Sequence, residues 1–321
     1  CLSIIYSLAN IVLSIIFILT VCNEKRWLGR IAGTTISALF VACYILYNIF
    51  KKSKPQFSGR YWKYALKISL PIIPHGLSQI VLSQFDRLMI NQVIGSAEAG
   101  LYSFAYNIGT IFQVIANSLD TAWTQWFFDQ MKEEKYSTIQ KTADIYCGLV
   151  SLGAIALMFI SPELIIFLGG VKYKESIAVT FPVLLAMYYA YMYNFPSSIE
   201  YYYKKTNLIA IGTMMAAGVN ILLNAIFIPK YGFVAAAYTT VFCYLLYYFL
   251  HIIFSRKIQK NAIYNIKHQM CFLLIVTGSM FLGLKLMNNI LIRYILLIIE
   301  MVGIGAVVFV KRKELKNLIG D

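Results

Sequence analysis

The stretch SQIVLSQFDRLMINQVIGSAEAG, residues 78–100, is apolar enough to cross a lipid bilayer, yet it carries an acid and a base side by side, Asp86 and Arg87. Each ionised group near the middle of a membrane helix costs about 2.5–3.5 kcal/mol on insertion scales. Two interpretations follow. The two residues form a buried ion pair that fixes helix packing, or they mark a charged spot on a polar path through the membrane.

The composition of the whole chain places it in a membrane. Of its 321 residues, 60% are hydrophobic and only 13% are charged, whereas soluble domains carry about 25% charged residues. A spanning helix needs about 20 mostly apolar residues. We therefore expect an all-α, polytopic bundle in the cell (plasma) membrane with about ten spans, over residues 2–22, 28–50, 68–94, 100–123, 143–168, 176–199, 207–228, 232–254, 269–287 and 290–310.

The basic residues predict the orientation of these spans. With the C-terminus placed inside, the inner connections hold 19 of the 28 Lys and Arg residues and the outer connections hold eight, Arg87 being the remaining one. Because cytoplasmic loops are enriched in Lys and Arg, we expect a cytoplasmic C-terminus. The same reasoning assigns the net charge of +14 to orientation and to anionic lipid, and not to a nucleic-acid partner.

Two basic inner connections suggest how the chain is divided. We expect the end of one helical lobe over 1–50, a basic cytoplasmic linker over 51–67, a second lobe over 68–254, and two further spans with a basic tail over 255–321. The segment Trp126–Lys141 is interpreted as an amphipathic helix lying on the inner membrane surface.

The motifs of membrane enzymes are missing from the sequence. It contains no G-x-x-x-x-G-K-[ST], H-E-x-x-H or G-x-S-x-G, and the outer connections are too short to carry a catalytic domain. None of the six cysteines forms a C-x-x-C or a Cys/His cluster. We therefore expect a protein that is not an enzyme, with no catalytic residues, no cofactor and no metal ligands.

Polar residues recur at membrane depth and are the candidate site residues. Pro71 and Pro74 predict an irregular start to the third span around His75, and Pro162 and Pro182 are expected to interrupt two later helices. His75 is either a packed, hydrogen-bonded residue or a proton carrier, and Glu300 is a second candidate for ion or proton coupling. The remaining polar side chains either hydrogen-bond between helices or line a wet cavity, and they include Gln79, Gln84, Asn107, Asn117, Asn220 and Asn224.

Three longer stretches resemble one protein family. They are SQFDRLMINQVIGSAEAGLYSFAYN (Ser83–Asn107), SPELIIFLGGVKYKES (Ser161–Ser176) and NILLNAIFIPKYGFVAAAYTT (Asn220–Thr240). In this order they are similar to the polysaccharide transporters, the flippases of O-antigen and capsule repeat units, in the multidrug/oligosaccharidyl-lipid/polysaccharide exporter superfamily. In the third stretch, Pro229 is expected to stop a helix and Gly232 to allow a tight turn.

The resemblance implies two helical lobes around a cavity that opens alternately to each side. The cargo would be a polyprenyl-diphosphate-linked oligosaccharide, moved to the outer leaflet. The opening helices of the first lobe are expected to lie outside this chain. Arg87, oriented by Asp86, would bind the diphosphate together with Gln79, Gln84, Asn107 and Asn117, and Na⁺ or H⁺ would be the coupling ion. Arg30 and Arg293 are weaker candidates.

Three alternatives remain open at this point. A multidrug or cation exporter of the same superfamily would need acids in its cavity, and the acids at depth are few. A membrane glycan polymerase or ligase would need larger outer loops. A structural membrane subunit is the third alternative, and no sequence pattern excludes it.

Overall fold

The computed structural model describes residues 2–20, 26–53 and 58–303, and within these ranges the chain is helical, which confirms the predicted fold class. The chain divides into two compact units, Cys1–Lys63 and Tyr64–Asp321. The division falls inside the expected linker 51–67. The expected tail over 311–321 and the end of the last predicted span, 304–310, lie outside the described residues.

The first unit is a helix pair, α1 (Leu2–Thr20) and α2 (Arg26–Lys52), followed by the start of α3 (Gly59–Ser69). A stripe of small residues on α2 faces α1: Gly29, Gly33 and Ser37 are buried. A Cβ at Gly33 would lie 2.5 Å from the backbone nitrogen of Ser14. Close backbone approach along small residues is how membrane helices gain packing contacts without a hydrophobic driving force.

The α1–α2 pairing predicts that Gly33→Leu separates the two helices, because there is no room for a side chain against Ser14. Overpacking of this kind costs about 1–3 kcal/mol, and it should appear as a lower unfolding midpoint in detergent. Gly218→Ala is the matched control, since a Cβ there meets nothing within 4 Å. Equal stability of the two variants would refute the tight α1–α2 contact.

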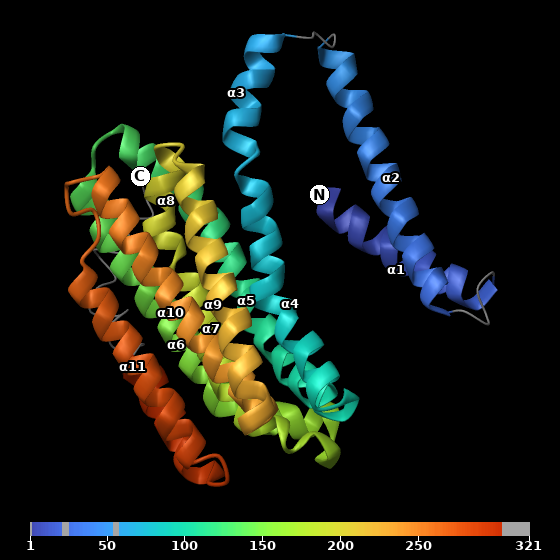
Figure 1. The fold of residues 1–321 in the computed structure, drawn as a ribbon, viewed down its shortest axis with the longest axis vertical. Helices are drawn as coiled ribbons and strands as arrows, with labels where there is room; N and C mark the ends of the chain where they lie inside the picture. Colours follow the sequence, from blue (N-terminus) through green and yellow to red (C-terminus); the bar gives the residue numbers. More distant parts are fainter. Residues whose placement is uncertain (1, 21–25, 54–57, 304–321) are drawn as a thin grey trace. The chain divides into compact units, whose positions relative to one another are not determined.

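The second unit is a bundle of long helices, seen from teal (α4) to red (α11) in Figure 1. Its centre is α7 (Ser176–Met192), of whose 17 residues 15 are buried. Around it pack α5 (Ser96–Lys132), α6 (Tyr136–Gly169), α10 (Phe233–Ile258) and α11 (Ile266–Lys285). The remaining elements are α4 (Ile72–Val93), the short α8 (Asn194–Tyr202), α9 (Thr206–Tyr231), a 3-10 turn (Val171–Tyr173) and a last helix over 290–303.

Seven helical segments of the described chain are long and apolar enough to cross a membrane: α2, α3 with α4, α6, α7 with α8, α9, α10 and α11. Three of the ten expected spans do not meet that measure. The apolar part of α1, Ile5–Thr20, is shorter, the helix over 290–303 continues into residues that are not described, and α5 is long but carries many polar residues.

The segment Trp126–Lys141 is not a separate surface helix, and that prediction is wrong. Residues 126–132 end α5 and residues 136–141 begin α6, with a turn at Glu134, whose φ is 56°. Phe127 and Ile139 are fully buried in the bundle. The apolar side of the segment therefore packs against protein, and it has no free face to offer to lipid.

Two of the proline predictions also need correction. Pro162 lies inside a continuous α6 and Pro182 inside a continuous α7, because neighbouring helices in a bundle satisfy the backbone groups that proline frees. Pro71 and Pro74 behave as expected: α3 ends at Ser69 and α4 begins at Ile72.

The α9–α10 turn also differs in detail from its prediction. α9 runs through Pro229 to Tyr231, and Gly232, with φ 76°, makes the turn. Because a left-handed φ suits glycine, the sequence places its turn residue there. Ala236 and Ala237 are fully buried at the start of α10.

Candidate functional site

Asp86 and Arg87 are neighbours in sequence, but α4 directs them to different surroundings. Asp86 is fully buried, and its carboxylate accepts hydrogen bonds from the hydroxyl of Tyr102 at 2.7 Å, Thr240 Oγ1 at 2.7 Å and Asn224 Nδ2 at 2.6 Å. These donors come from α5, α10 and α9. Several donors satisfy this buried carboxyl group, so this contact ties four helices together.

A second layer of hydrogen bonds holds the donors of Asp86 in place. Asn224 Nδ2 also donates to Asn220 Oδ1 at 3.1 Å, and Thr239 donates to Asn224 Oδ1. Asn220 Nδ2 reaches Thr240 Oγ1 at 3.2 Å. The spacing of Asn220 and Asn224, one helical turn apart, predicted their shared face, and the hydrogen-bonding interpretation is the one that the structure supports for them.

This cluster is rich in oxygen atoms, which are the ligands that hard cations prefer. The carboxylate of Asp86 is nevertheless satisfied by the protein's own donors, so a cation would have to displace them. Within the described residues, no three or more of His, Cys, Asp and Glu gather in a group that would hold a metal ion.

Arg87 is half-buried. Asp86 was expected to orient its guanidinium, but in the structure Gln84 and Tyr106 contact it instead. Its Nη1 donates to Gln84 Oε1 at 2.9 Å, and its guanidinium carbon lies 4.5 Å from the ring centre of Tyr106. In the described part of the chain, Arg87 forms no ion pair, with Asp86 or with any other acid. The carboxylate of Asp86 is engaged elsewhere. Gln84 and Tyr106 hold Arg87, and its guanidinium has no salt-bridge partner among the described residues.

Exposed polar residues continue along α5 from the neighbourhood of Arg87. Asn107 follows Tyr106 directly, and both it and Asn117 are exposed. Residues spaced by three, four or seven share one helix face. That spacing places six exposed polar residues in one stripe together with the apolar Val114, which is 65% exposed. The six polar residues are here called the α5 polar stripe: Asn107, Thr110, Asn117, Ser118, Thr121 and Gln125.

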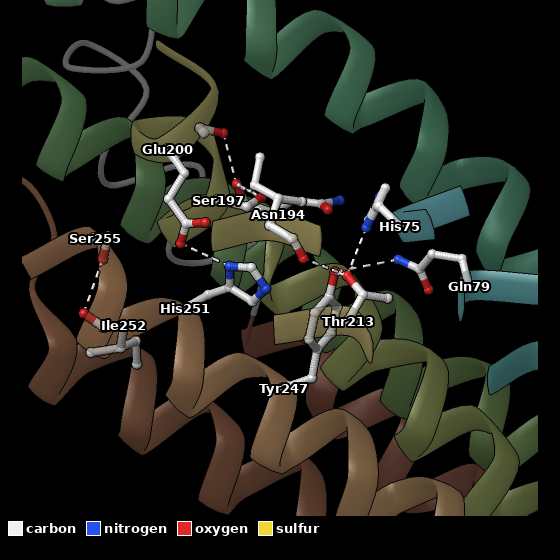
Figure 2. Close-up of polar contacts among 12 residues, drawn as sticks. His75, Gln79, Asn194, Ser197, Glu200, Thr213, Tyr247, His251, Ile252 and Ser255 are labelled. Carbon is white, nitrogen blue, oxygen red and sulfur yellow. Dashed lines mark hydrogen bonds and ion pairs between the residues drawn. The ribbon is translucent and has the colours of Figure 1, made fainter. Parts of the chain in front are cut away.

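The structure separates Gln79 and His75 from this stripe. His75 Nδ1 lies 2.6 Å from Thr213 Oγ1, which in turn lies 2.9 Å from the hydroxyl of Tyr247 (Figure 2). Gln79 Nε2 reaches the same hydroxyl at 3.5 Å. Both residues therefore belong to a buried network that links α4, α9 and α10.

The other candidates are now placed as well. Arg293 is 1% exposed, and its guanidinium binds both carboxylate oxygens of Glu163 and the carbonyl oxygen of Phe159. It therefore anchors the 290–303 helix to α6 and is not available to cargo. Arg30 is exposed on α2. Glu300 is half-buried, and neither of its carboxylate oxygens has a partner in the part of the chain that is described.

Sequence reasoning missed the pair Glu200 and His251. Both are fully buried, and His251 Nδ1 lies 2.7 Å from Glu200 Oε1. The sequence shows Glu200 at the end of one apolar segment and His251 inside another, and these positions were the signals from which a buried polar site could have been predicted. Their pairing, 51 positions apart, is a property of the fold.

The Asp86 cluster leads to a stability prediction. In Asp86→Asn, an amide group must face donors that now point at a carboxylate, so the variant should lose about 1–3 kcal/mol of stability. Unfolding of the purified chain in detergent measures this.

The control for this variant is Asp129→Asn, which removes a carboxylate paired with Lys132 at 2.9 Å and about two-thirds exposed. Surface pairs of this kind contribute little, so this control should stay close to the wild type. A loss as large in the control as in Asp86→Asn would contradict the role given to Asp86.

The fold and the exposed polar stripe define a class: a membrane helix bundle with the architecture of transporters. An outward-facing multidrug resistance transporter of the MATE family, in the MOP superfamily, matches with a TM-score of 0.64 at 18% identity, over 80% of this chain and 61% of that one. The lipid II flippase MurJ in an inward closed conformation matches with a TM-score of 0.63 at 14% identity, over 97% of this chain and 67% of that one.

Residues 1–131 match the model of the family described as "Polysaccharide biosynthesis protein". This match and the shared fold confirm the resemblance to polysaccharide transporters and to the exporter superfamily. The chain spans less than two thirds of the length of the MATE transporter. No curated protein sequence matches the chain.

Proposed function

We propose that this chain is part of a membrane transporter that moves polyprenyl-diphosphate-linked oligosaccharide units from the cytoplasmic to the outer leaflet by alternating access, and that it catalyses no bond chemistry. The observation that carries the proposal is Arg87, a half-buried and unneutralised cation beside an exposed polar stripe on a membrane-crossing bundle. Facing lipid, such a cation and such a stripe would be costly.

The chemistry of this face suits a charged sugar lipid. A guanidinium binds phosphate oxygens with two parallel hydrogen bonds, and burial strengthens that contact. Amides and hydroxyls, such as those of Asn107, Thr110 and Asn117, match sugar hydroxyls in donor and acceptor capacity. Gln84 and Tyr106 hold the guanidinium in one orientation, which reduces the entropy lost on binding.

The direction of movement is also favourable for an anion. An inside-negative membrane assists the outward movement of negative charge by about 2.3 kcal/mol per charge per 100 mV. The cytoplasmic placement of the C-terminus, on which this direction depends, remains a proposal that rests on the distribution of Lys and Arg.

A multidrug or cation exporter is the second candidate function, because the MATE fold is equally close. Such a transporter needs an accessible acid, but Asp86 is sealed by three hydrogen bonds. Asp120, half-buried on α5, lies 14 residues from Tyr106, which is about 20 Å along a helix. The charge at the Arg87 end of this face is therefore positive, which favours an anionic cargo there.

The proposal predicts that Arg87→Gln weakens binding of a polyprenyl-diphosphate-linked oligosaccharide by at least about tenfold, because a charge-assisted contact is lost. The affinity is measured on the purified chain in lipid nanodiscs. Neutral polyprenol, which has no phosphate, should bind the wild type and the variant equally.

Arg256→Gln is the matched control, since Arg256 is exposed in the last turn of α10 and lies off the polar face. It should leave the affinity unchanged. Unchanged affinity in Arg87→Gln as well would remove Arg87 from the site. Binding of a cationic dye that depends on Asp120 would favour the multidrug exporter instead.

A further inference from the structure

The pair Glu200–His251 lies apart from the proposed cargo face, in the interior between α8 and α10. Both side chains are fully buried, and one hydrogen bond of 2.7 Å joins His251 Nδ1 to Glu200 Oε1 (Figure 2). The other two polar atoms, Glu200 Oε2 and His251 Nε2, are buried with no hydrogen-bond partner within the described residues. Such orphaned groups are costly, and in native structures they often mark a functional site.

The surroundings of the pair are aromatic and tightly packed. The rings of Tyr247 and Tyr193 lie 4.6 and 5.3 Å from the imidazole of His251. On the α9 side stands Gly212, where a Cβ would lie 2.7 Å from His251 Nε2. No lysine or arginine of the described residues forms an ion pair with Glu200. Among the described residues, the imidazole is therefore the one basic side chain that contacts this carboxyl.

Charge balance then fixes how many protons the packed pair holds. With one labile proton the pair is neutral overall, on whichever of the two residues that proton sits. Without it, an unpaired negative charge remains in a dry interior, and with a second one an unpaired positive charge appears. Both charged states carry a large desolvation cost. The packed arrangement therefore binds one proton.

The short helix α8, which carries Glu200, is the element that can move when the pair loses its proton. α7 ends at Met192 and the short α8 begins at Asn194, with Pro196 in its first turn. Because proline has no backbone N–H, this junction lacks one helical hydrogen bond. Glu200 lies one turn before Lys204 in the turn to α9, so a small movement of α8 brings the carboxylate to water.

We propose that Glu200 and His251 form a proton-binding site whose occupancy holds α8 against α10, and that proton release frees α8 and couples the transport cycle to the proton gradient. The coupling rests on the proposed transport function, whereas proton binding can be measured without any cargo. A hydrogen-bonded line through Tyr247 and Thr213 leads from the neighbourhood of the pair to His75 (Figure 2).

Other titratable groups surround the pair and must be separated from it in any measurement. They come from the α7–α8 segment, α10, α4 and α5, and are Tyr193, Tyr201, Tyr247, His75 and Asp120. The chain has only three histidines, His75, His251 and His268, so ¹⁵N NMR of labelled histidine resolves each ring, with His251→Asn assigning the signal of interest.

The test is a pH titration of the chain in nanodiscs from about pH 5 to about pH 9. This range includes the pH at which an ordinary histidine changes its charge. We expect the His251 ring signal of the wild type to shift in one step as the pair gains or loses its proton, because the ring is hydrogen-bonded to the carboxyl whichever group holds that proton. Glu200→Gln should remove this step and leave a neutral imidazole throughout, whereas Glu200→Asp should restore it. Restoration by the shorter acid excludes a general folding defect as the cause of the loss.

The matched control is the chain's other histidine–acid pair, His268 and Asp144, which are joined at 2.6 Å but are 56% and 26% exposed. Asp144→Asn should change the signal of His268 and leave that of His251 as in the wild type. An identical His251 titration in wild type and Glu200→Gln would overturn the proposal, and so would the absence of any step in the wild type.

Coupling is tested separately, with the full-length transporter of the proposed function, in proteoliposomes that contain a pH-sensitive dye and receive a polyprenyl-diphosphate-linked oligosaccharide. We expect the wild type to move protons with this cargo, and Glu200→Gln to bind it equally but move none. Cargo movement without protons in the wild type would overturn the coupling. No cargo movement at all would overturn the proposed function, and the coupling with it, while the titration would still decide proton binding.

Discussion

A polar group inside a membrane bundle must find a partner within the protein, and this constraint governs the second unit. Asp86 shows it most clearly: a fully buried carboxyl group with no salt-bridge partner in the described chain is held by three donors from three other helices. Two of those donors, Asn224 and Thr240, are themselves held by hydrogen bonds to Asn220 and Thr239. Since each of these groups would be costly without its partner, the network specifies how α4, α5, α9 and α10 meet.

The same constraint makes the exceptions informative. Arg87 keeps its charge unneutralised, and the α5 polar stripe stays exposed although its helix belongs to a membrane bundle. Glu200 and His251 share one hydrogen bond, and one further polar atom of each has no partner among the described residues. The first exception is the site that we propose for cargo, and the second is fully buried. A transporter needs both kinds of site, one for what it carries and one for what drives it.

The sequence predicts a great deal of the fold, because hydropathy and helix-breaking residues act locally. The helical class, the break before α4 and the shared face of Asn220 and Asn224 all follow from spacing. The sequence does not predict that Asp86 and Arg87 have different surroundings. Consecutive side chains lie about 100° apart on a helix, but the partners of each residue come from helices that are distant in the sequence. For the same reason Glu200 and His251 went unnoticed, and the α5–α6 turn was taken for a surface helix.

The central claim is that the α5 polar stripe borders water within the membrane, and cysteine accessibility tests it most directly. In a version of the chain whose native cysteines are replaced, Asn117→Cys and Leu222→Cys are treated in intact membranes with a hydrophilic thiol reagent. Leu222 is 64% exposed, on an apolar stretch of α9. The account predicts labelling at position 117 and protection at position 222. Protection of both positions from the reagent would contradict it.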